Sequence, residues 1–266
     1  MSDWLFKSAS AVSRRAFLSL FVAGGAAAAA QTVPARRGSV IPKIRALAFD
    51  AFPILDPRPV FSLAEELFPG RGADLSSVWR TRQFEYQWLR AISGRCADFQ
   101  RTTEDALVFA AAMLRLDLTP DKRHRLMGAY LELTAWPDVS PALRSLRCDG
   151  VRLAFLSNAT PAILQAGIRN SGLEGIFEHV LSTDSIKTYK PDPRTYRMAM
   201  DAFGLRREEI AFVAFAGWDA AGAKSFGYPT FWTNRLNLPA EELGALPDAV
   251  GKSLDDLLTY LRAQQC

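Results

Sequence analysis

The side chains that could do chemistry in this sequence are carboxylates, hydroxyls, lysine and arginine. There are two histidines and three cysteines, and none has the spacing of metal ligands, which argues against zinc and haem chemistry. Asp50 directly follows one short apolar run, and Ser157 with Asn158 ends another. Lys190 stands in a turn just ahead of a stretch with helical periodicity, and Asp219 opens another such stretch. Any catalysis should therefore rest on these residues and their neighbours.

A single aspartate after an apolar run has a plain explanation, because Asp is common in turns and at helix N-caps. Asp50 differs because three other polar features follow it in order along the chain. They are the pair Ser157-Asn158, the turn Tyr189–Asp192 that contains a lysine, and the motif Trp218–Gly222 with its acid. We therefore treat Asp50 as a candidate nucleophile.

The elements that must position these residues alternate between strands and helices. Apolar runs predict strands over 44–49, 151–156, 179–182, 210–213 and 230–233, and helical periodicity predicts helices over about 139–147, 160–171, 193–203 and 218–226. This alternation is typical of an α/β fold, a doubly wound parallel-sheet (Rossmann-like) core domain with helices on both faces. Ligands of such sheets bind at the carboxyl ends of the strands, where Asp50, Ser157 and Asn158 stand.

Residues 58–134 interrupt this alternation. Amphipathic helices are predicted over 75–90, 103–116 and 121–133, with no apolar strand among them. We expect a helical cap subdomain at 58–134 that can close over the strand ends, inserted into a core domain formed by 43–57 and 135–266.

The first 35 residues have the pattern of a bacterial export signal. Arg14 and Arg15 precede a weakly apolar run, Leu20 to Ala30, that is too short and too rich in alanine for a stable membrane span. Paired arginines before such a run resemble the twin-arginine signal, so we expect a signal peptide at 1–35, the twin-arginine export machinery as a partner, and a periplasmic mature protein. Cleavage after Ala30 or Ala35 fits the small residues; an uncleaved anchor or a chance basic start is the alternative.

The charge balance argues against nucleic acid as a partner. The chain of 266 residues has 32 basic and 28 acidic side chains, and setting aside the three bases and one acid before residue 36 leaves 29 against 27. Nucleic-acid binding that is driven by counterion release requires clustered Lys and Arg. Nearly equal numbers of basic and acidic side chains do not favour such a cluster. The length fits one core domain with a smaller insert. A homodimer and a Cys96–Cys148 disulfide both stay open at this point.

The order of these motifs resembles the haloacid dehalogenase superfamily, from about Ile44 to the end of the chain. Phosphatases of that superfamily carry an Asp two positions after the nucleophile, where this chain has Phe52. An aromatic residue there, together with the motif from Trp79 to Arg90 in the expected cap, is similar to the type II (L-specific) 2-haloacid dehalogenases. The resemblance implies that a small 2-halocarboxylic acid of (S) configuration and water are converted to an (R)-2-hydroxyacid through an aspartyl ester, with no cofactor and no metal.

The resemblance also implies roles for the candidate residues. Asp50 attacks the halogen-bearing carbon, and Arg80 with Asn158 stabilises the departing halide. Lys190 keeps Asp50 ionised, and Asp219 activates the water that opens the ester. Ser157 and the backbone amides after Asp50 hold the substrate carboxylate, and Tyr196 supports Lys190 and the nucleophile. The expected substrate-binding set is Ala51, Phe52, Ser157, Tyr196, Trp218, Phe84 and Phe99, in which plain core packing is the alternative for Phe84 and Phe99.

Three polar side chains of the family pattern are absent from this chain. Ile54 stands where the family has a threonine that bonds the nucleophile, and Ala214 and Ala216 replace a serine and an asparagine near the hydrolytic water. Loss of these polar groups should lower the rate and slow ester hydrolysis more than ester formation. Two alternatives to an active dehalogenase remain: a catalytically impaired protein of this fold with a binding or structural role in the periplasm, and a phosphatase of the same superfamily.

Overall fold

Six parallel strands form one sheet in the order β3-β2-β1-β4-β5-β6. A computed structural model describes residues 44–264, so the expected signal peptide at 1–35 lies outside the described residues. The strands are β1 (Ala46–Phe49), β2 (Arg152–Ser157), β3 (His179–Ser182), β4 (Ile210–Ala214), β5 (Thr230–Thr233) and β6 (Ala249–Gly251). β1 pairs with both β2 and β4, so it lies inside the sheet. Its carboxyl end therefore lies between the carboxyl ends of those two strands.

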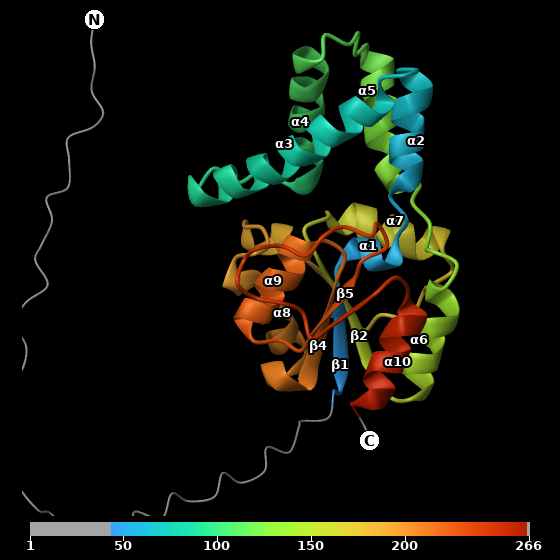
Figure 1. Ribbon diagram of the computed structural model, residues 1–266, viewed down its shortest axis with the longest axis vertical. Coiled ribbons are helices and arrows are strands. Elements are labelled where there is room, and N and C mark those ends of the chain that lie inside the picture. Colours follow the sequence, from blue (N-terminus) through green and yellow to red (C-terminus); the bar gives the residue numbers. More distant parts are fainter. Residues whose placement is uncertain (1–43, 265–266) are drawn as a thin grey trace, which may run out of the picture. The chain divides into compact units, whose positions relative to one another are not determined.

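Helices cover both faces of the sheet, and the side chains of β1 alternate between them. Ala46 and Ala48 belong to the apolar cluster on the side of α8 (Pro193–Phe203) and α9 (Gly217–Phe226). Leu47 and Phe49 belong to the cluster on the side of α6 (Val139–Cys148), α7 (Pro161–Asn170) and α10 (Leu254–Ala263). Figure 1 shows α8 and α9 on one side of the sheet and α6 and α10 on the other. The predicted α/β architecture is confirmed.

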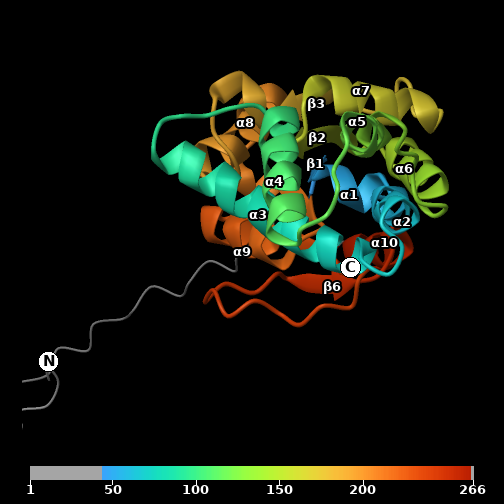
Figure 2. The same ribbon diagram turned by 90° about the horizontal axis from the view of Figure 1, so that it is seen from above.

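The helical region inserted between β1 and β2 is built from four helices. They are α2 (Arg58–Leu67), α3 (Gly72–Ile92), α4 (Phe99–Met113) and α5 (Pro120–Gly128), which continues into a 3₁₀ turn at Ala129–Leu131. The indole N–H of Trp79 in α3 donates to the carbonyl of Thr103 in α4 at 2.8 Å, which joins the two helices. Figure 2 shows α3 and α4 crossing above the sheet. Within residues 44–264, no helix is long and apolar enough to cross a membrane.

Two adjacent segments connect this cap to the sheet. Leu55 and Ala135 form an antiparallel bridge, and the Trp136 amide donates to the Ile54 carbonyl at 3.0 Å. The Trp136 indole N–H donates to the carbonyl of Phe52 at 3.0 Å. The connection therefore begins only a few residues after the end of β1, so the cap is attached close to Asp50.

The five predicted strands and four predicted core helices are confirmed, with ends that shift by at most two residues. The sequence reasoning missed a short helix α1 (Ala51–Ile54), α2, the edge strand β6 and α10. Helix α4 begins at Phe99 rather than 103, because the Asp98 side chain caps it by accepting from the Arg101 amide at 2.7 Å. Cys96 and Cys148 are both free thiols, so the bridge left open by the sequence is not formed.

Candidate active site

Asp50 stands at the carboxyl end of β1 and caps the short helix α1. Its Oδ1 accepts hydrogen bonds from Lys190 Nζ at 2.8 Å and from Ser157 Oγ at 3.1 Å. Its Oδ2 has one longer contact, 3.4 Å from the Phe52 amide. Ser157 ends β2, the strand next to β1, so parallel pairing brings these two side chains together. The carboxylate thus has one strongly bound oxygen and one that is nearly free.

Lys190 connects Asp50 to a second carboxylate. Its side chain is 1% exposed, and Nζ lies 2.8 Å from Asp50 Oδ1 and 2.6 Å from Asp219 Oδ2. A third bond goes to the Leu156 carbonyl at 3.2 Å, which uses the last of its three donors. Burial on its own would lower the pKa of Lys190, but the two carboxylates outweigh it and raise that pKa, so the ammonium stays charged.

Asp219 lies in the first turn of α9, buried beside Lys190. The Tyr196 hydroxyl in α8 donates a hydrogen bond to Asp219 Oδ1 at 2.7 Å, while Asp219 Oδ2 accepts one from Lys190 Nζ. Burial, helped by the negative charge of Asp50, raises the pKa of Asp219 to about 6, although Lys190 and the Tyr196 hydroxyl act in the opposite direction. A carboxyl group with this pKa can accept a proton near neutral pH, as a general base must.

Arg80 projects from α3 of the cap into the same site. Among residues 44–264 its guanidinium has no ion pair or hydrogen bond; its neighbours are the rings of Phe84 and Phe215, whose centroids lie 5.6 Å and 5.7 Å from Cζ. Burial lowers the pKa of Arg80, and the charge of Asp50 counters part of this effect. An unpaired cation against aromatic rings is suited to bind an anion that is itself poorly hydrated.

Asn158 is held by a network that fixes the orientation of its amide. Its Oδ1 accepts from the Lys190 backbone amide at 3.0 Å and from Thr183 Oγ1 at 3.1 Å. Its Nδ2 donates to Gln87 Oε1 at 3.0 Å, so this core residue is bonded directly to the cap.

These residues enclose a small cavity of about 30 Å³. It is lined by Asp50, Phe52, Arg80, Phe84, Gln87, Phe99, Ser157, Asn158, Ala159, Lys190, Phe215, Ala216, Trp218 and Asp219. This volume is enough for ordered water, since one water needs roughly 10–15 Å³ of such space.

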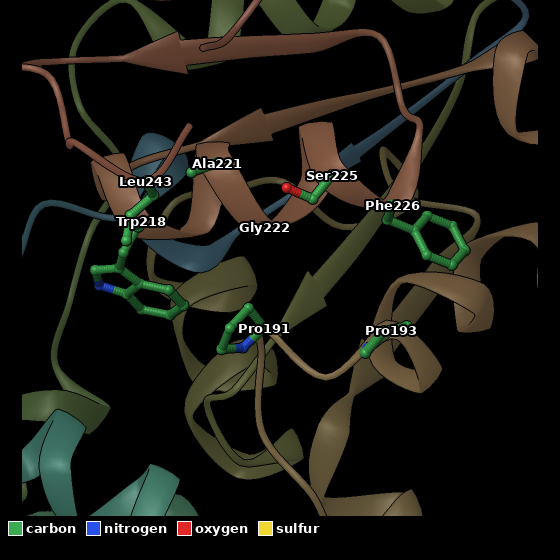
Figure 3. A pocket seen from close by; sticks show the side chains of 8 residues that line it. All are labelled: Pro191, Pro193, Trp218, Ala221, Gly222, Ser225, Phe226 and Leu243. Atoms are coloured by element: carbon green, nitrogen blue, oxygen red, sulfur yellow. The ribbon is translucent and has the colours of Figure 1, made fainter. Parts of the chain in front are cut away.

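Two larger hollows, of about 400 Å³ and 690 Å³, lie against the other side of Trp218. Figure 3 shows Trp218 and Leu243 at one end of the smaller of these hollows and Phe226 at the other. Neither hollow is lined by Asp50, Lys190 or Asp219. The reactive groups are therefore gathered in the small cavity, and Trp218 lines this cavity and both hollows.

The structure brings most of the sequence-predicted residues together. The residues that line the cavity include all five predicted catalytic side chains and five of the substrate-binding ones: Phe52, Phe84, Phe99, Ser157 and Trp218. Tyr196 does not line it; its hydroxyl contacts Asp219 rather than Lys190 or Asp50, so its effect on a substrate passes through Asp219. The Ala51 side chain is also buried away from the cavity.

The three positions that depart from the family pattern have different surroundings. Ile54 is fully buried in the apolar core, and Ala216 lines the cavity. Ala214 does not line it, because its side chain is buried in the apolar cluster on the α8 and α9 side of the sheet. Of the two alanines, Ala216 therefore lies at the cavity and Ala214 lies beneath it in the cluster that also contains Tyr196.

Sequence reasoning missed Gln87, which is fully buried and lines the cavity. Its spacing of seven residues from Arg80 on a helix could have indicated that both share one face. Among residues 44–264, no group of three or more His, Cys, Asp or Glu side chains could hold a metal ion. The space between the two carboxylates is occupied by the Lys190 ammonium.

Comparison with known proteins assigns the chain to a family. The family model described as haloacid dehalogenase-like hydrolase matches residues 26–227. The chain is 42% identical over 217 residues to haloacetate dehalogenase H-2 of Moraxella sp. (strain B), covering 81% of this chain and 97% of that protein. It is 44% identical over 206 residues to an (S)-2-haloacid dehalogenase of Pseudomonas sp. (strain YL), covering 77% and 89%.

Solved structures show the same likeness in three dimensions. A crystal structure of an L-2-haloacid dehalogenase matches with a TM-score of 0.81 and 41% identity, covering 83% of this chain and 99% of that one. The L-2-haloacid dehalogenase of Xanthobacter autotrophicus with chloropropionic acid covalently bound matches with a TM-score of 0.76 and 32% identity, covering 82% and 98%.

Proposed function

The chain belongs to the haloacid dehalogenase-like hydrolases, and from this premise we propose that it hydrolyses (S)-2-haloacids to (R)-2-hydroxyacids through an ester on Asp50. The observation that carries the proposal is the contact of Lys190 with both Asp50 and Asp219 in a cavity that also receives the unpaired Arg80. Two relatives at about 40% identity are by name a haloacetate dehalogenase and an (S)-2-haloacid dehalogenase.

The first step forms the ester. Asp50 Oδ2, which has only the 3.4 Å contact with Phe52, attacks the carbon that carries the halogen, while Lys190 and Ser157 hold Oδ1. The carbon–oxygen bond forms as the carbon–halogen bond breaks, and the halide leaves with both electrons. In-line displacement inverts the carbon, which turns an (S) substrate into an (R) product. Arg80 stabilises the charge that develops on the halide.

The second step opens the ester. Asp219 takes a proton from a water that attacks the carboxyl carbon of Asp50. The tetrahedral intermediate then collapses by breaking the bond between this carbon and the ester oxygen, and the departing oxygen takes the proton back from Asp219, so the bond between oxygen and the substrate carbon is kept. Tyr196 and Lys190 fix the two oxygens of Asp219 and so orient this base. Lys190 also balances the negative charge that the tetrahedral intermediate develops on the former Asp50 carboxyl group.

The test measures halide release from (S)-2-chloropropionate by the purified protein, with (R)-2-chloropropionate as the control substrate. We expect release from the (S) acid alone, none from Asp50→Ala, and a mass increase on the Asp50 peptide when Asp219→Asn traps the ester. Absence of halide release from every (S)-2-haloacid tried, or faster hydrolysis of a phosphate monoester, would falsify the proposal.

We further propose that residues 1–35 direct the protein through the twin-arginine machinery to the periplasm. The support is the pair Arg14-Arg15 ahead of a weak apolar run. Replacing both with lysine should leave the precursor in the cytoplasm, which cell fractionation measures, whereas exchange of Arg36 and Arg37 for lysine should leave export unchanged. Normal export of the Arg14→Lys, Arg15→Lys variant would refute this route.

A further inference from the structure

Gln87 is a buried polar residue of the active-site cavity to which the mechanism above gives no role. It is fully buried on α3 and lines the cavity. Its Oε1 accepts from Asn158 Nδ2 at 3.0 Å, while its Nε2 has no hydrogen-bond partner among the described residues. A buried donor without an acceptor is unfavourable, so such a group in a cavity indicates an acceptor that binds there.

The orientation of this amide follows from the network around it. The Lys190 backbone N–H can only donate, so the atom of Asn158 that it contacts must be the oxygen. The nitrogen of Asn158 then faces Gln87, and the Gln87 atom opposite it must be an oxygen. The atom left without a partner is therefore the NH₂ group of Gln87, which is a donor.

The stereochemistry of the proposed reaction places the acceptor on the cap side. Asp50 attacks from the core, and in-line displacement drives the halide away from the attacking oxygen, toward the cap. The α3 residues that line the cavity are Arg80, Phe84 and Gln87, which share one helix face at spacings of four and seven. Arg80 and Gln87 are therefore the two polar groups that the cap presents to the leaving group.

We propose that Gln87 is a halide-binding residue whose Nε2 donates a hydrogen bond to the departing halide alongside Arg80. This inference rests on the proposed function and assigns a leaving-group contact that the sequence did not indicate. The Asp50 oxygen bonds to the carbon, the halide leaves with the electron pair, and Gln87 keeps its proton throughout. Its bond to Asn158 holds the amide in place for this contact.

The test compares leaving groups in a single turnover. Gln87→Met removes the donor and keeps the length of the side chain. We expect the rate of halide release from (S)-2-chloropropionate to fall about tenfold or more, the range for a hydrogen bond to a charged group. The loss with (S)-2-bromopropionate should be smaller, because bromide spreads its charge over a larger ion and accepts a weaker hydrogen bond. The substrate KM should change little.

A second variant and a second measurement make the test independent of folding and of turnover. Gln87→Glu keeps an acceptor for Asn158 but turns the free donor into an anionic oxygen, and should lose more activity than Gln87→Met. Broadening of the ³⁵Cl NMR line of chloride measures chloride binding to the protein without substrate. Both variants should reduce this broadening. Gln83→Met is the matched control, since Gln83 is buried on the same helix and its Nε2 donates to Thr103 inside the cap.

Equal losses with chloride and bromide leaving groups, a raised KM without a change in rate, or unchanged line broadening would overturn the inference. If the unaltered protein releases no halide from any 2-haloacid, the proposed function fails. Line broadening then still decides the inference: loss of chloride binding in Gln87→Met supports it, and retained binding refutes it.

Discussion

Lys190 Nζ lies closer to Asp219, at 2.6 Å from Oδ2, than to the nucleophile Asp50, at 2.8 Å from Oδ1. One ammonium thus separates two carboxylates, of which Asp219 is 2% exposed and Asp50 13% exposed. Without it the two carboxylates would repel each other. The lysine therefore balances the negative charge of the nucleophile and of the base together.

Lys190→Met should abolish halide release and destabilise the fold. Removing one partner of a buried ion pair leaves the other charge unpaired, which typically costs about 3–5 kcal/mol. Urea denaturation at pH 7 measures the change, and Lys187→Met is the control because that lysine pairs with Asp184 at the surface. A Lys190→Met protein as stable as the parent would show that the two carboxylates tolerate each other.

The pH dependence of ester hydrolysis should follow Asp219, whose pKa is raised to about 6. The base works only when ionised, so the rate of ester hydrolysis should fall in acid; because the ester removes the negative charge of Asp50, which helps raise this pKa, the midpoint should lie below about 6. The stability of the fold should change in the opposite direction with pH. Because the folded state binds the Asp219 proton more tightly than the unfolded chain does, Asp219 makes the fold less stable as the pH rises from about 4 to 6. Stopped-flow kinetics and urea titrations measure the two trends.

Tyr196→Phe should shift the acid limb of that rate profile to higher pH. The Tyr196 hydroxyl donates to Asp219 Oδ1 and lowers its pKa, so removing it should raise the pKa further. Tyr228→Phe is the control, because its hydroxyl is also buried in this cluster but donates to the Tyr196 carbonyl. A downward shift, or the same shift in both variants, would contradict the assigned role of Tyr196.

The sequence was sufficient for the parts of the site that follow directly from strand ends. Asp50 and Ser157 stand at the ends of neighbouring parallel strands, Lys190 precedes a helix and Asp219 lies in the first turn of another. The rule for parallel sheets therefore places all four at the carboxyl ends of the strands. Gln87 was not predicted from the sequence, because helical periodicity does not show which buried side-chain amide lacks a hydrogen-bond partner. That information exists only once Asn158 and the Lys190 backbone have fixed each other's orientation.

The elements that the sequence reasoning missed lack a strong local pattern. Strand β6 has three residues at the sheet edge, and Val250 is 55% exposed, so no apolar run marks it. Ala214 shows a different difficulty. Strand periodicity places it on a face but does not say whether that face meets the cavity, and here it meets the α8 and α9 layer.

Ala216→Asn should both stabilise the protein and speed ester hydrolysis. Ala216 is the N-cap of α9 and has no side-chain capping bond, and an N-cap Asn is worth about 0.5–2 kcal/mol more than Ala. Its amide would also reach the cavity beside Asp219, where it can orient water. Ala214→Ser, the control, adds a hydroxyl to a buried apolar cluster and should lower stability without changing the rate of ester hydrolysis.

Arg80→Met should raise stability while it removes activity. The Arg80 guanidinium is buried with no ion pair or hydrogen bond among residues 44–264, so the charge of Asp50 and the neighbouring rings offset only part of its desolvation in the resting fold. The same cation stabilises the departing halide, and its loss should slow ester formation about 10²–10³-fold, the range for removing one such electrostatic contact. Arg82→Met on the same helix is the control, because Arg82 pairs with Glu85 and lies over the Phe109 ring, so its removal should lower stability and leave ester formation unchanged. Thermal unfolding and single-turnover halide release measure the two effects, and a destabilised Arg80→Met protein would show that the guanidinium supports the resting fold instead of being held ready for the halide.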